Sequence, residues 1–228
     1  MLNFGQFECL TFDCYGTMIN WEEGLLGALR PILERHGVKL TDEEILRAYS
    51  EFEPAQQRRS YRKYRDILQA IVVDFGDRYN FRPALDEIES LPNSIENWQP
   101  FPDTVAALRR LKKKFKLVVI SNIDDDLFAH SARWLEVPFD HVITAQQAKS
   151  YKPSYNNFKL ALERIGLPKE KVLHVAQSLH HDVAPCNELG IRSVWVNRKG
   201  HQRATQASNA KPDLEVHDLQ SLTDLATK

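Results

Sequence analysis

The hydrophobic and polar positions of this chain follow two kinds of pattern. Short runs rich in apolar and β-branched residues, each ending near polar residues, are typical of buried strands. Such runs occupy residues 9–13, 116–122, 141–145, 171–178 and 192–198. The final segment, residues 209–228, predicts one more short edge strand followed by a last helix.

Stretches with helical periodicity lie between these strand candidates. Residues 102–114 place their apolar side chains on one face, and Asp103 is a candidate N-cap. Residues 154–166 begin with a serine that can cap a helix and end with glycine, and residues 183–190 also end with glycine. Strands that alternate with helices predict βαβ units and an α/β fold with a mainly parallel sheet.

The segment from residue 20 to residue 97 has a different character. It is long, polar and rich in helical patterns, and it contains no convincing parallel-strand run. Thr41 and Glu44 have the spacing of a capping box. We interpret this segment as a helical insertion after the first strand. The expected division is therefore 1–19 with 98–228 as one domain and 20–97 as the other.

Composition narrows the classes of function. The 228 residues carry a net charge of -1, so no overall field favours nucleic acid or an anionic membrane. No apolar stretch approaches the roughly 18 to 20 residues of a membrane helix, and "MLNFGQF" lacks a signal peptide's basic and apolar regions. Cys9, Cys14 and Cys186 lack metal-ligand spacing and are expected to be free thiols. We therefore predict a cytoplasmic protein without membrane or nucleic-acid partners. The oligomeric state stays open, with a homodimer as one option.

Polar side chains follow four of the predicted strands. They are Asp13 and Thr17, then Ser121 and Asn122, then Lys152, and finally Asp182. Each could be an ordinary cap, turn or surface residue. However, ligands of parallel α/β sheets bind outside the carboxyl ends of the strands. Because all four groups fall at such ends, we expect them to form one site.

These residues and their order resemble the haloacid dehalogenase superfamily over nearly the whole chain. "FDCYGT" resembles the first motif of that superfamily, with Asp13 as the nucleophile. "VVISN" resembles the second motif, Lys152 with Pro153 the third, and "QSLHHD" the fourth. The helical insertion resembles the cap domain. The resemblance implies a Rossmann-like catalytic core, residues 1–19 and 98–228, and a helical cap, residues 20–97.

The residue two places after the nucleophile separates branches of this superfamily. Magnesium-dependent phosphatases of the superfamily have a second aspartate there, which serves as general acid and base, whereas this chain has Tyr15. Their fourth motif commonly begins with Gly-Asp, and here Ala176 and Gln177 take those places. Since Mg²⁺ favours a shell of hard oxygen ligands, two remaining carboxylates make a magnesium site unfavourable. We expect no metal and no cofactor.

The Asp-x-Tyr-Gly-Thr form instead resembles the L-2-haloacid dehalogenases. That resemblance implies displacement of a halide from a small 2-haloalkanoic acid by Asp13, followed by hydrolysis of the resulting ester. Lys152 would pair with Asp13 and hold its pKa low. Asp182 would hold Lys152 or help to activate water. The groups expected to orient or enclose the substrate are Tyr15, Thr17, Ser121, Asn122 and Ser178.

Some positions depart from that branch. Gln177 and Leu179 replace a serine and an asparagine of the fourth motif, and Phe158 replaces a tyrosine. The cap arginine that receives the halide has four candidates, Arg47, Arg58, Arg59 and Arg62. Two roles are open for His180 and His181: a structural role and activation of the hydrolytic water. A phosphatase and a non-catalytic member that binds an anion or a protein partner are the alternatives.

Overall fold

The computed structural model describes residues 2–58, 60–198, 206 and 208–228. Its centre is a parallel sheet of six strands in the order β3-β2-β1-β4-β5-β6. The strands are β1 (Cys9–Phe12), β2 (Lys116–Ser121), β3 (His141–Thr144), β4 (Val172–Ala176), β5 (Arg192–Val196) and β6 (Leu214–Val216). This order confirms the predicted α/β fold with a parallel sheet, including the edge strand near the C-terminus.

Strand β1 lies inside the sheet, between β2 and β4. All four of its residues are buried, as are all five of β4, which is expected for parallel strands covered by helices on both sides. In register, Phe12 stands opposite Val119 of β2 and Val175 of β4. The next residue of the chain, Asp13, therefore emerges between two neighbouring strand ends.

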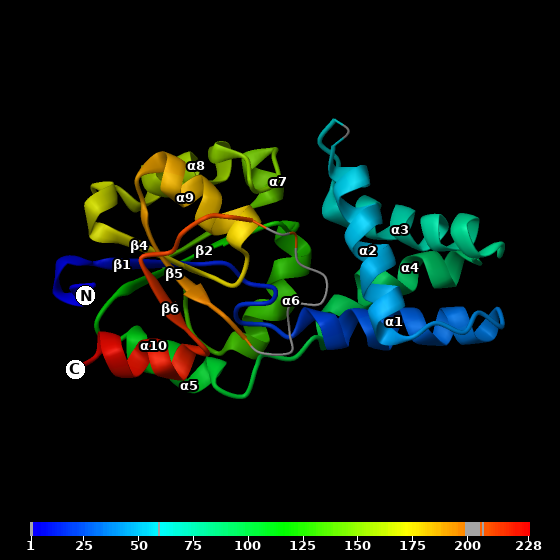
Figure 1. Ribbon diagram of the computed structural model, residues 1–228, viewed down its shortest axis with the longest axis horizontal. Coiled ribbons are helices and arrows are strands. Elements are labelled where there is room, and N and C mark those ends of the chain that lie inside the picture. Colours follow the sequence, from blue (N-terminus) through cyan, green and yellow to red (C-terminus); the bar gives the residue numbers. More distant parts are fainter. Residues whose placement is uncertain (1, 59, 199–205, 207) are drawn as a thin grey trace.

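Helices cover both faces of the sheet (Figure 1). Helices α7 (Ala145–Ala148), α8 (Tyr155–Ile165) and α9 (Ala184–Leu189) lie above it in that view, and α5 (Thr104–Leu111) and α10 (Leu219–Ala226) lie below. Helix α6 (Asp125–Leu135) follows β2. The predicted caps of α8 are present, because the Ser154 side chain accepts from Asn156 N and Gly166 ends the helix in the left-handed conformation. Asp103 does not cap α5; its carboxylate instead pairs with Arg198.

Residues 21–97 contain helices α1 (Trp21–Arg35), α2 (Asp42–Gln57), α3 (Tyr64–Tyr79) and α4 (Leu85–Ser94), followed by the short helix η2 (Ile95–Asn97). They gather to one side of the sheet (Figure 1). Thr41 and Glu44 form the predicted capping box at the start of α2. This helical group stands beside the carboxyl ends of the strands, where Tyr64 N and Arg65 N donate to the Asp124 carboxylate.

A glycine in α1 fixes a close contact within this group. A Cβ added to Gly24 would lie 2.4 Å from the Trp98 indole ring, so only glycine lets the ring pack there. Trp98 donates from Nε1 to Ser94 Oγ at 3.0 Å, and its ring meets Tyr15 edge-on at 5.8 Å between centroids. The contact therefore links α1, the end of α4 and the turn after β1.

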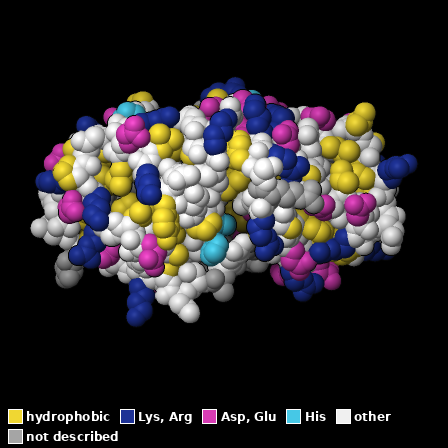
Figure 2. All heavy atoms as spheres, turned by 90° about the horizontal axis from the view of Figure 1, so that it is seen from above, with side chains coloured by type: hydrophobic (Ala, Val, Ile, Leu, Met, Phe, Trp, Pro, Cys, Tyr) yellow, Lys and Arg dark blue, Asp and Glu magenta, His cyan; other side chains and the backbone are white. Residues whose placement is uncertain are grey.

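The outer surface has an ordinary mixed character. Figure 2 shows basic and acidic side chains interspersed over the visible face, without a large area of one sign, in keeping with a net charge of -1. Among the residues that the structure describes, no helix combines the length and apolar character needed to cross a membrane.

Candidate active site

The turn after β1 holds the carboxylate of Asp13 at the end of the sheet. Gly16 has φ +94°, and a Cβ there would approach Trp21 Nε1 and Gln177 Oε1 to 3.1 Å, so the turn requires glycine. Thr17 Oγ1 donates to Asp13 Oδ2 at 2.7 Å and accepts from Gln177 N at 2.9 Å. Thr17 thus positions the carboxylate and ties the turn to the end of β4.

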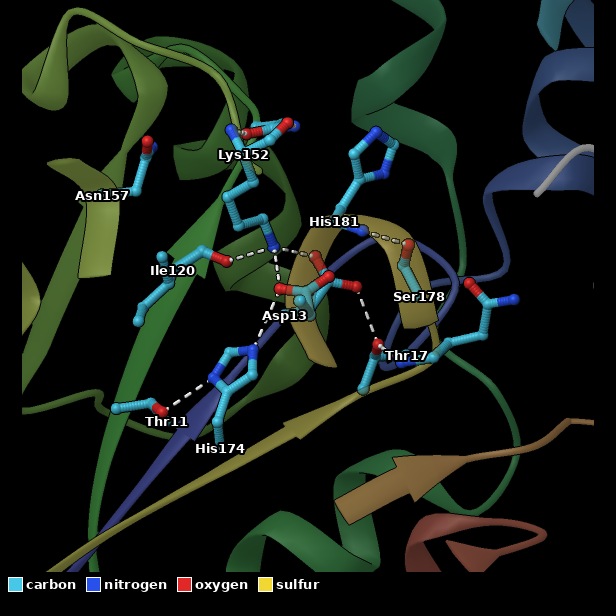
Figure 3. A network of polar contacts seen from close by, with 12 residues as sticks. Thr11, Asp13, Thr17, Ile120, Lys152, Asn157, His174, Ser178 and His181 are labelled. Carbon is cyan, nitrogen blue, oxygen red and sulfur yellow. Dashed lines mark hydrogen bonds and ion pairs between the residues drawn. The ribbon is translucent and has the colours of Figure 1, made fainter. Parts of the chain in front are cut away.

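The ammonium group of Lys152 lies between two carboxylates (Figure 3). Its Nζ donates to Asp13 Oδ1 at 2.8 Å, to Asp182 Oδ1 at 2.6 Å and to the carbonyl of Ile120 at 2.9 Å. The side chain is 2% exposed, so these contacts lie away from bulk water. All three donor hydrogens of the ammonium group are accounted for.

The loop that carries Lys152 is held by Asn122, which follows β2. Asn122 Oδ1 accepts from Lys152 N at 2.7 Å, and Asn122 Nδ2 donates to the Lys152 carbonyl at 3.1 Å. Asn157, in the first turn of α8, exchanges hydrogen bonds with Ser150 of the loop. Asn122 was expected to orient the substrate, but its amide oxygen and nitrogen are used to fix the position of the lysine.

A buried histidine that the sequence interpretation missed lies beneath Asp182. His174 Nε2 is 2.9 Å from Asp182 Oδ1, and His174 Nδ1 is 2.8 Å from Thr11 Oγ1 (Figure 3). The edge of its ring meets Phe158 at 5.3 Å between centroids. The available signal was its place inside the otherwise apolar strand "VLHVA", because a buried polar side chain needs a partner.

Burial and ion pairing act in opposite directions on the carboxylates. For Asp13, burial raises the pKa and outweighs the contacts with Lys152 and Thr17 that lower it. The expectation that Lys152 would hold this pKa low was therefore wrong, because desolvation of the buried group exceeds the effect of the ion pair. For Asp182, burial is outweighed by Lys152 and His174, and the pKa falls to about 2.

The carboxylates open into a small cavity between the sheet and the helices of residues 21–97. Its volume is about 90 Å³, which corresponds to a few water molecules at ~30 Å³ each. Its walls combine aromatic residues with polar and charged ones. Tyr15, Trp21 and Trp98 line it, and Tyr49, Glu53 and Tyr64 line it from α2 and α3. Tyr15 Oη lies 2.8 Å from Ser131 Oγ, so its ring is fixed as a wall.

Two buried polar atoms of this cavity lack a hydrogen-bond partner among the described residues. They are Ser121 Oγ and Asp182 Oδ2, and both residues line the cavity. Ser178 also lines it, but its Oγ accepts from His181 N at 3.0 Å. Ser121 Oγ and Asp182 Oδ2 therefore keep hydrogen-bonding capacity that no described protein group uses.

A family model described as haloacid dehalogenase-like hydrolase matches residues 7–190. The chain belongs to the haloacid dehalogenase-like hydrolases. (S)-2-haloacid dehalogenase H-109 of Pseudomonas putida is 32% identical over 149 residues, which cover 62% of this chain and 64% of that protein. Haloacid dehalogenase-like hydrolase domain-containing protein 3 of Danio rerio is 33% identical over 166 residues, 68% of this chain and 64% of that protein. The matched region spans less than two thirds of the length of these relatives.

Solved structures of this family have the same fold. The L-2-haloacid dehalogenase from Xanthobacter autotrophicus, with chloropropionic acid covalently bound, superposes with a TM-score of 0.82 at 17% identity. The match covers 97% of this chain and 98% of that one. At this level of identity the likeness establishes the shared architecture of sheet and helices.

None of the candidate halide-binding arginines that the structure describes lines the cavity. Arg47, Arg58 and Arg62 do not line the cavity, and Arg59 lies outside the described residues. Arg62 Nη2 donates to Gln56 Oε1 at 2.6 Å. Arg58 lines a neighbouring surface hollow, which shares Lys152 and His181 with the cavity. Among the described residues, the side of the cavity formed by α2 and α3 presents Glu53 and tyrosines.

The two histidines of the fourth motif differ in position. Both lie in η4 (Leu179–Val183), with ring centroids 5.0 Å apart. His181 lines the cavity, and burial lowers its pKa to about 4, so its imidazole is neutral near pH 7. His180 lines the outer hollows and not the cavity.

The donor set does not suit the magnesium ion that many members of this superfamily use. Lys152 Nζ occupies the space between Asp13 Oδ1 and Asp182 Oδ1, where it contacts both. Tyr15 and Gln177 stand where the phosphatases have acids. Within the described ranges, no group of three or more His, Cys, Asp or Glu side chains has metal-binding geometry. We therefore derive no step through a metal ion.

Proposed function

We propose that the protein is a hydrolase of carbon–halogen bonds that acts on small 2-haloalkanoic acids. The observation that carries this proposal is the setting of Asp13. It is a buried carboxylate, held by Lys152 and Thr17, that opens into a small aromatic cavity with Tyr15 where phosphatases have their second acid. Membership of the haloacid dehalogenase-like hydrolases supports the same reaction class.

The first step is a nucleophilic displacement at the carbon that bears the halogen. An oxygen of Asp13 forms a bond to that carbon while the carbon–halogen bond breaks, and the halide leaves with the electron pair. A poorly hydrated carboxylate is a stronger nucleophile than one in water, and burial of Asp13 at 6% exposure supplies this condition. Lys152 and Thr17 hold its orientation.

The second step is hydrolysis of the aspartyl ester. Asp182 Oδ1 is engaged by Lys152 and His174, whereas Oδ2 has no partner among the described residues. We assign Oδ2 as the base that accepts a proton from water while the water oxygen attacks the ester carbonyl carbon of Asp13. The tetrahedral intermediate then collapses as its bond to the substrate oxygen breaks, and that oxygen takes the proton from Asp182. The second proton of the water is released, so the 2-hydroxy acid leaves and both carboxylates are regenerated.

The substrate carboxylate is assigned to Ser121. Its hydroxyl is the buried donor that faces the cavity without a protein partner in the described part of the chain. Tyr15, Trp21 and Trp98 form the apolar walls around the halogen-bearing carbon. Thr17, Asn122 and Ser178 support the site, since their side chains hydrogen-bond to other protein groups.

Mass spectrometry of protein quenched during turnover with L-2-chloropropionate tests the proposal. We expect an ester adduct on the peptide that contains Asp13, together with chloride release. Asp13→Asn should abolish both. No adduct and no halide from any short haloacid would overturn the proposal.

A phosphatase is the second candidate within the same family, and an aryl phosphate with added Mg²⁺ separates the two. Phosphate release that a chelator abolishes would favour the phosphatase. Chloride release that is insensitive to the chelator would favour the dehalogenase. If neither product forms, a non-catalytic member that binds an anion or a protein partner gains support.

A cytoplasmic location and a homodimer remain part of this proposal. Cys9, Cys14 and Cys186 are buried free thiols, which suits a reducing compartment. Localisation of a tagged chain tests the first point, and light scattering of the purified protein tests the second.

A further inference from the structure

Three oxygen atoms converge on the cap side of the cavity, opposite the carboxylate of Asp13. Glu53 Oε1 accepts from Tyr64 Oη at 2.6 Å and from Tyr49 Oη at 3.1 Å, and the two phenol oxygens are 2.7 Å apart. Tyr49 and Glu53 come from α2, and Tyr64 begins α3. All three residues line the cavity.

The two tyrosines contact one carboxyl oxygen of Glu53 and do not contact the other. Oε1 is within hydrogen-bond distance of both phenol oxygens, which also contact each other, while Oε2 has no protein partner in the part of the chain that the structure describes. No lysine or arginine of the described residues pairs with Glu53. When Tyr49 and Tyr64 both donate to Oε1, a protonated Glu53 carries its proton on Oε2, where that proton is available to a ligand in the cavity.

The charges around the cavity favour the neutral form of Glu53. Across the cavity Asp13 and Asp182 face a single ammonium group, that of Lys152, and neutral His181 lies beside them. An ionised Glu53 would add a second net negative charge to a space of about 90 Å³ that has to accept an anionic haloacid. Tyr49, Tyr64 and the nearby Tyr151 add no positive charge. Burial raises the pKa of Glu53, and the tyrosine contacts only partly oppose this.

The direction of the displacement brings the leaving atom to this acid. In such a reaction the attacking oxygen, the carbon and the halogen lie in line, so the halide leaves on the side away from Asp13. That side is the wall formed by α2 and α3. We infer that Glu53, as a neutral acid oriented by Tyr49 and Tyr64, donates a hydrogen bond to the departing halide. This inference rests on the proposed dehalogenase reaction and replaces the expected arginine with O–H donors.

Substitution of Glu53 tests the inference through the leaving group. Glu53→Met removes the donor, and kcat should fall about 100-fold, the loss typical of one transition-state hydrogen-bond donor. The loss should be larger for 2-chloropropionate than for 2-bromopropionate, because chloride is the poorer leaving group and depends more on a donor. Equal losses for both substrates would indicate a structural role and overturn the inference.

The matched variant Glu53→Gln retains a neutral N–H donor and cannot ionise. In the wild type, kcat/KM should fall at high pH as Glu53 loses its proton, and in Glu53→Gln this fall should disappear. Glu51→Gln, on the exposed side of the same helix, serves as the control and should keep the wild-type profile. A fall at high pH that persists unchanged in Glu53→Gln would contradict the inference.

Bromide binding separates this inference from the proposed function. Trp21 and Trp98 line the cavity, so bound bromide should quench their fluorescence saturably at neutral pH, and more weakly as pH rises. Glu53→Met should show only linear, collisional quenching. Saturable bromide binding that depends on Glu53, without turnover of any haloacid, would contradict the proposed reaction but support the halide site. Identical quenching of the wild type and Glu53→Met would contradict the inferred halide site, whether or not haloacids are turned over.

Discussion

At the scale of single residues, the site depends on how one ammonium group is shared. Lys152 contacts Asp13 and Asp182 at nearly the same distance, yet the two carboxylates have different environments. Asp182 also contacts His174, whereas Asp13 also contacts Thr17 and opens to the cavity. This asymmetry favours Asp13 as the nucleophile, because the extra partner stabilises the charge on Asp182 and leaves Asp13 the less stabilised, more reactive carboxylate.

His174 is expected to control the second step and not the first. When the Thr11 hydroxyl donates to Nδ1, Nε2–H donates to Asp182 Oδ1 and fixes which oxygen faces the cavity. His174→Phe should slow ester hydrolysis about 10-fold or more, so the Asp13 adduct accumulates while the initial burst of halide is retained. Rapid-quench mass spectrometry measures both quantities.

Two variants separate this positioning role from general damage to the core. Thr11→Val keeps the His174–Asp182 contact and should accumulate less adduct than His174→Phe. His174→Gln, which can still donate to Asp182, should recover part of the hydrolysis rate. A burst and a steady-state rate that fall in equal proportion in His174→Phe would show that the histidine does not act on the ester.

At the scale of secondary-structure elements, the packing of α1 determines the shape of the cavity. Gly24→Ala places a Cβ against the Trp98 ring, which has to move. Overpacking of this kind costs about 1–3 kcal/mol of unfolding free energy, and displacement of a cavity wall should raise KM. Urea denaturation and haloacid kinetics measure the two effects.

The same helix offers a matched control for that substitution. Gly27 has no atom within 4 Å of an added Cβ, and alanine is favoured over glycine in a helix by about 1 kcal/mol. Gly27→Ala should therefore stabilise the protein and leave KM unchanged. Equal effects of the two substitutions would argue against the Trp98 contact as the cause.

The order of elements also explains which parts of the site could be predicted. Because parallel strands end at one edge of the sheet, the positions of Asp13, Lys152 and Asp182 in the sequence were enough to bring them together. Glu53 and its tyrosines could not be found this way, since helical periodicity indicates an apolar face but not which core residues that face will meet. Long-range packing between α2, α3 and the core decides their position.

At the scale of the whole molecule, the opposing pKa shifts make activity and stability depend on pH in different ways. Displacement requires ionised Asp13, whose pKa lies above the ordinary value of 3.8. As the pH is lowered, activity should therefore begin to fall at a higher pH than it would if the nucleophile were a solvent-exposed aspartate. Asp182, with a pKa of about 2, stays ionised throughout this range and does not cause the fall. A profile of kcat/KM against pH measures it.

The same shifts act on folding with opposite signs. A carboxyl group whose pKa is raised in the folded protein destabilises it as pH rises from the unfolded-state pKa to the folded-state pKa, and the full effect is present above the latter. A group with a lowered pKa stabilises the protein fully above the unfolded-state pKa. Asp13→Asn should thus increase the free energy of unfolding at pH 7, with a gain that shrinks as pH falls through the pKa of Asp13. Asp182→Asn should decrease it at pH 7 by about 2 kcal/mol, because the favourable contacts that lower its pKa from 3.8 to about 2 are lost.

Urea titrations of the two variants and the wild type at several pH values decide between these signs. Both substitutions replace a buried carboxylate that contacts the same ammonium group, so they form a matched pair. If burial dominates at Asp13 and ion pairing dominates at Asp182, the free energies of unfolding of the two variants must change in opposite directions at pH 7. Destabilisation by both would mean that the ion pair outweighs burial at Asp13 as well, and the acid limb of activity should then lie near or below pH 3.8, the ordinary pKa of an aspartate.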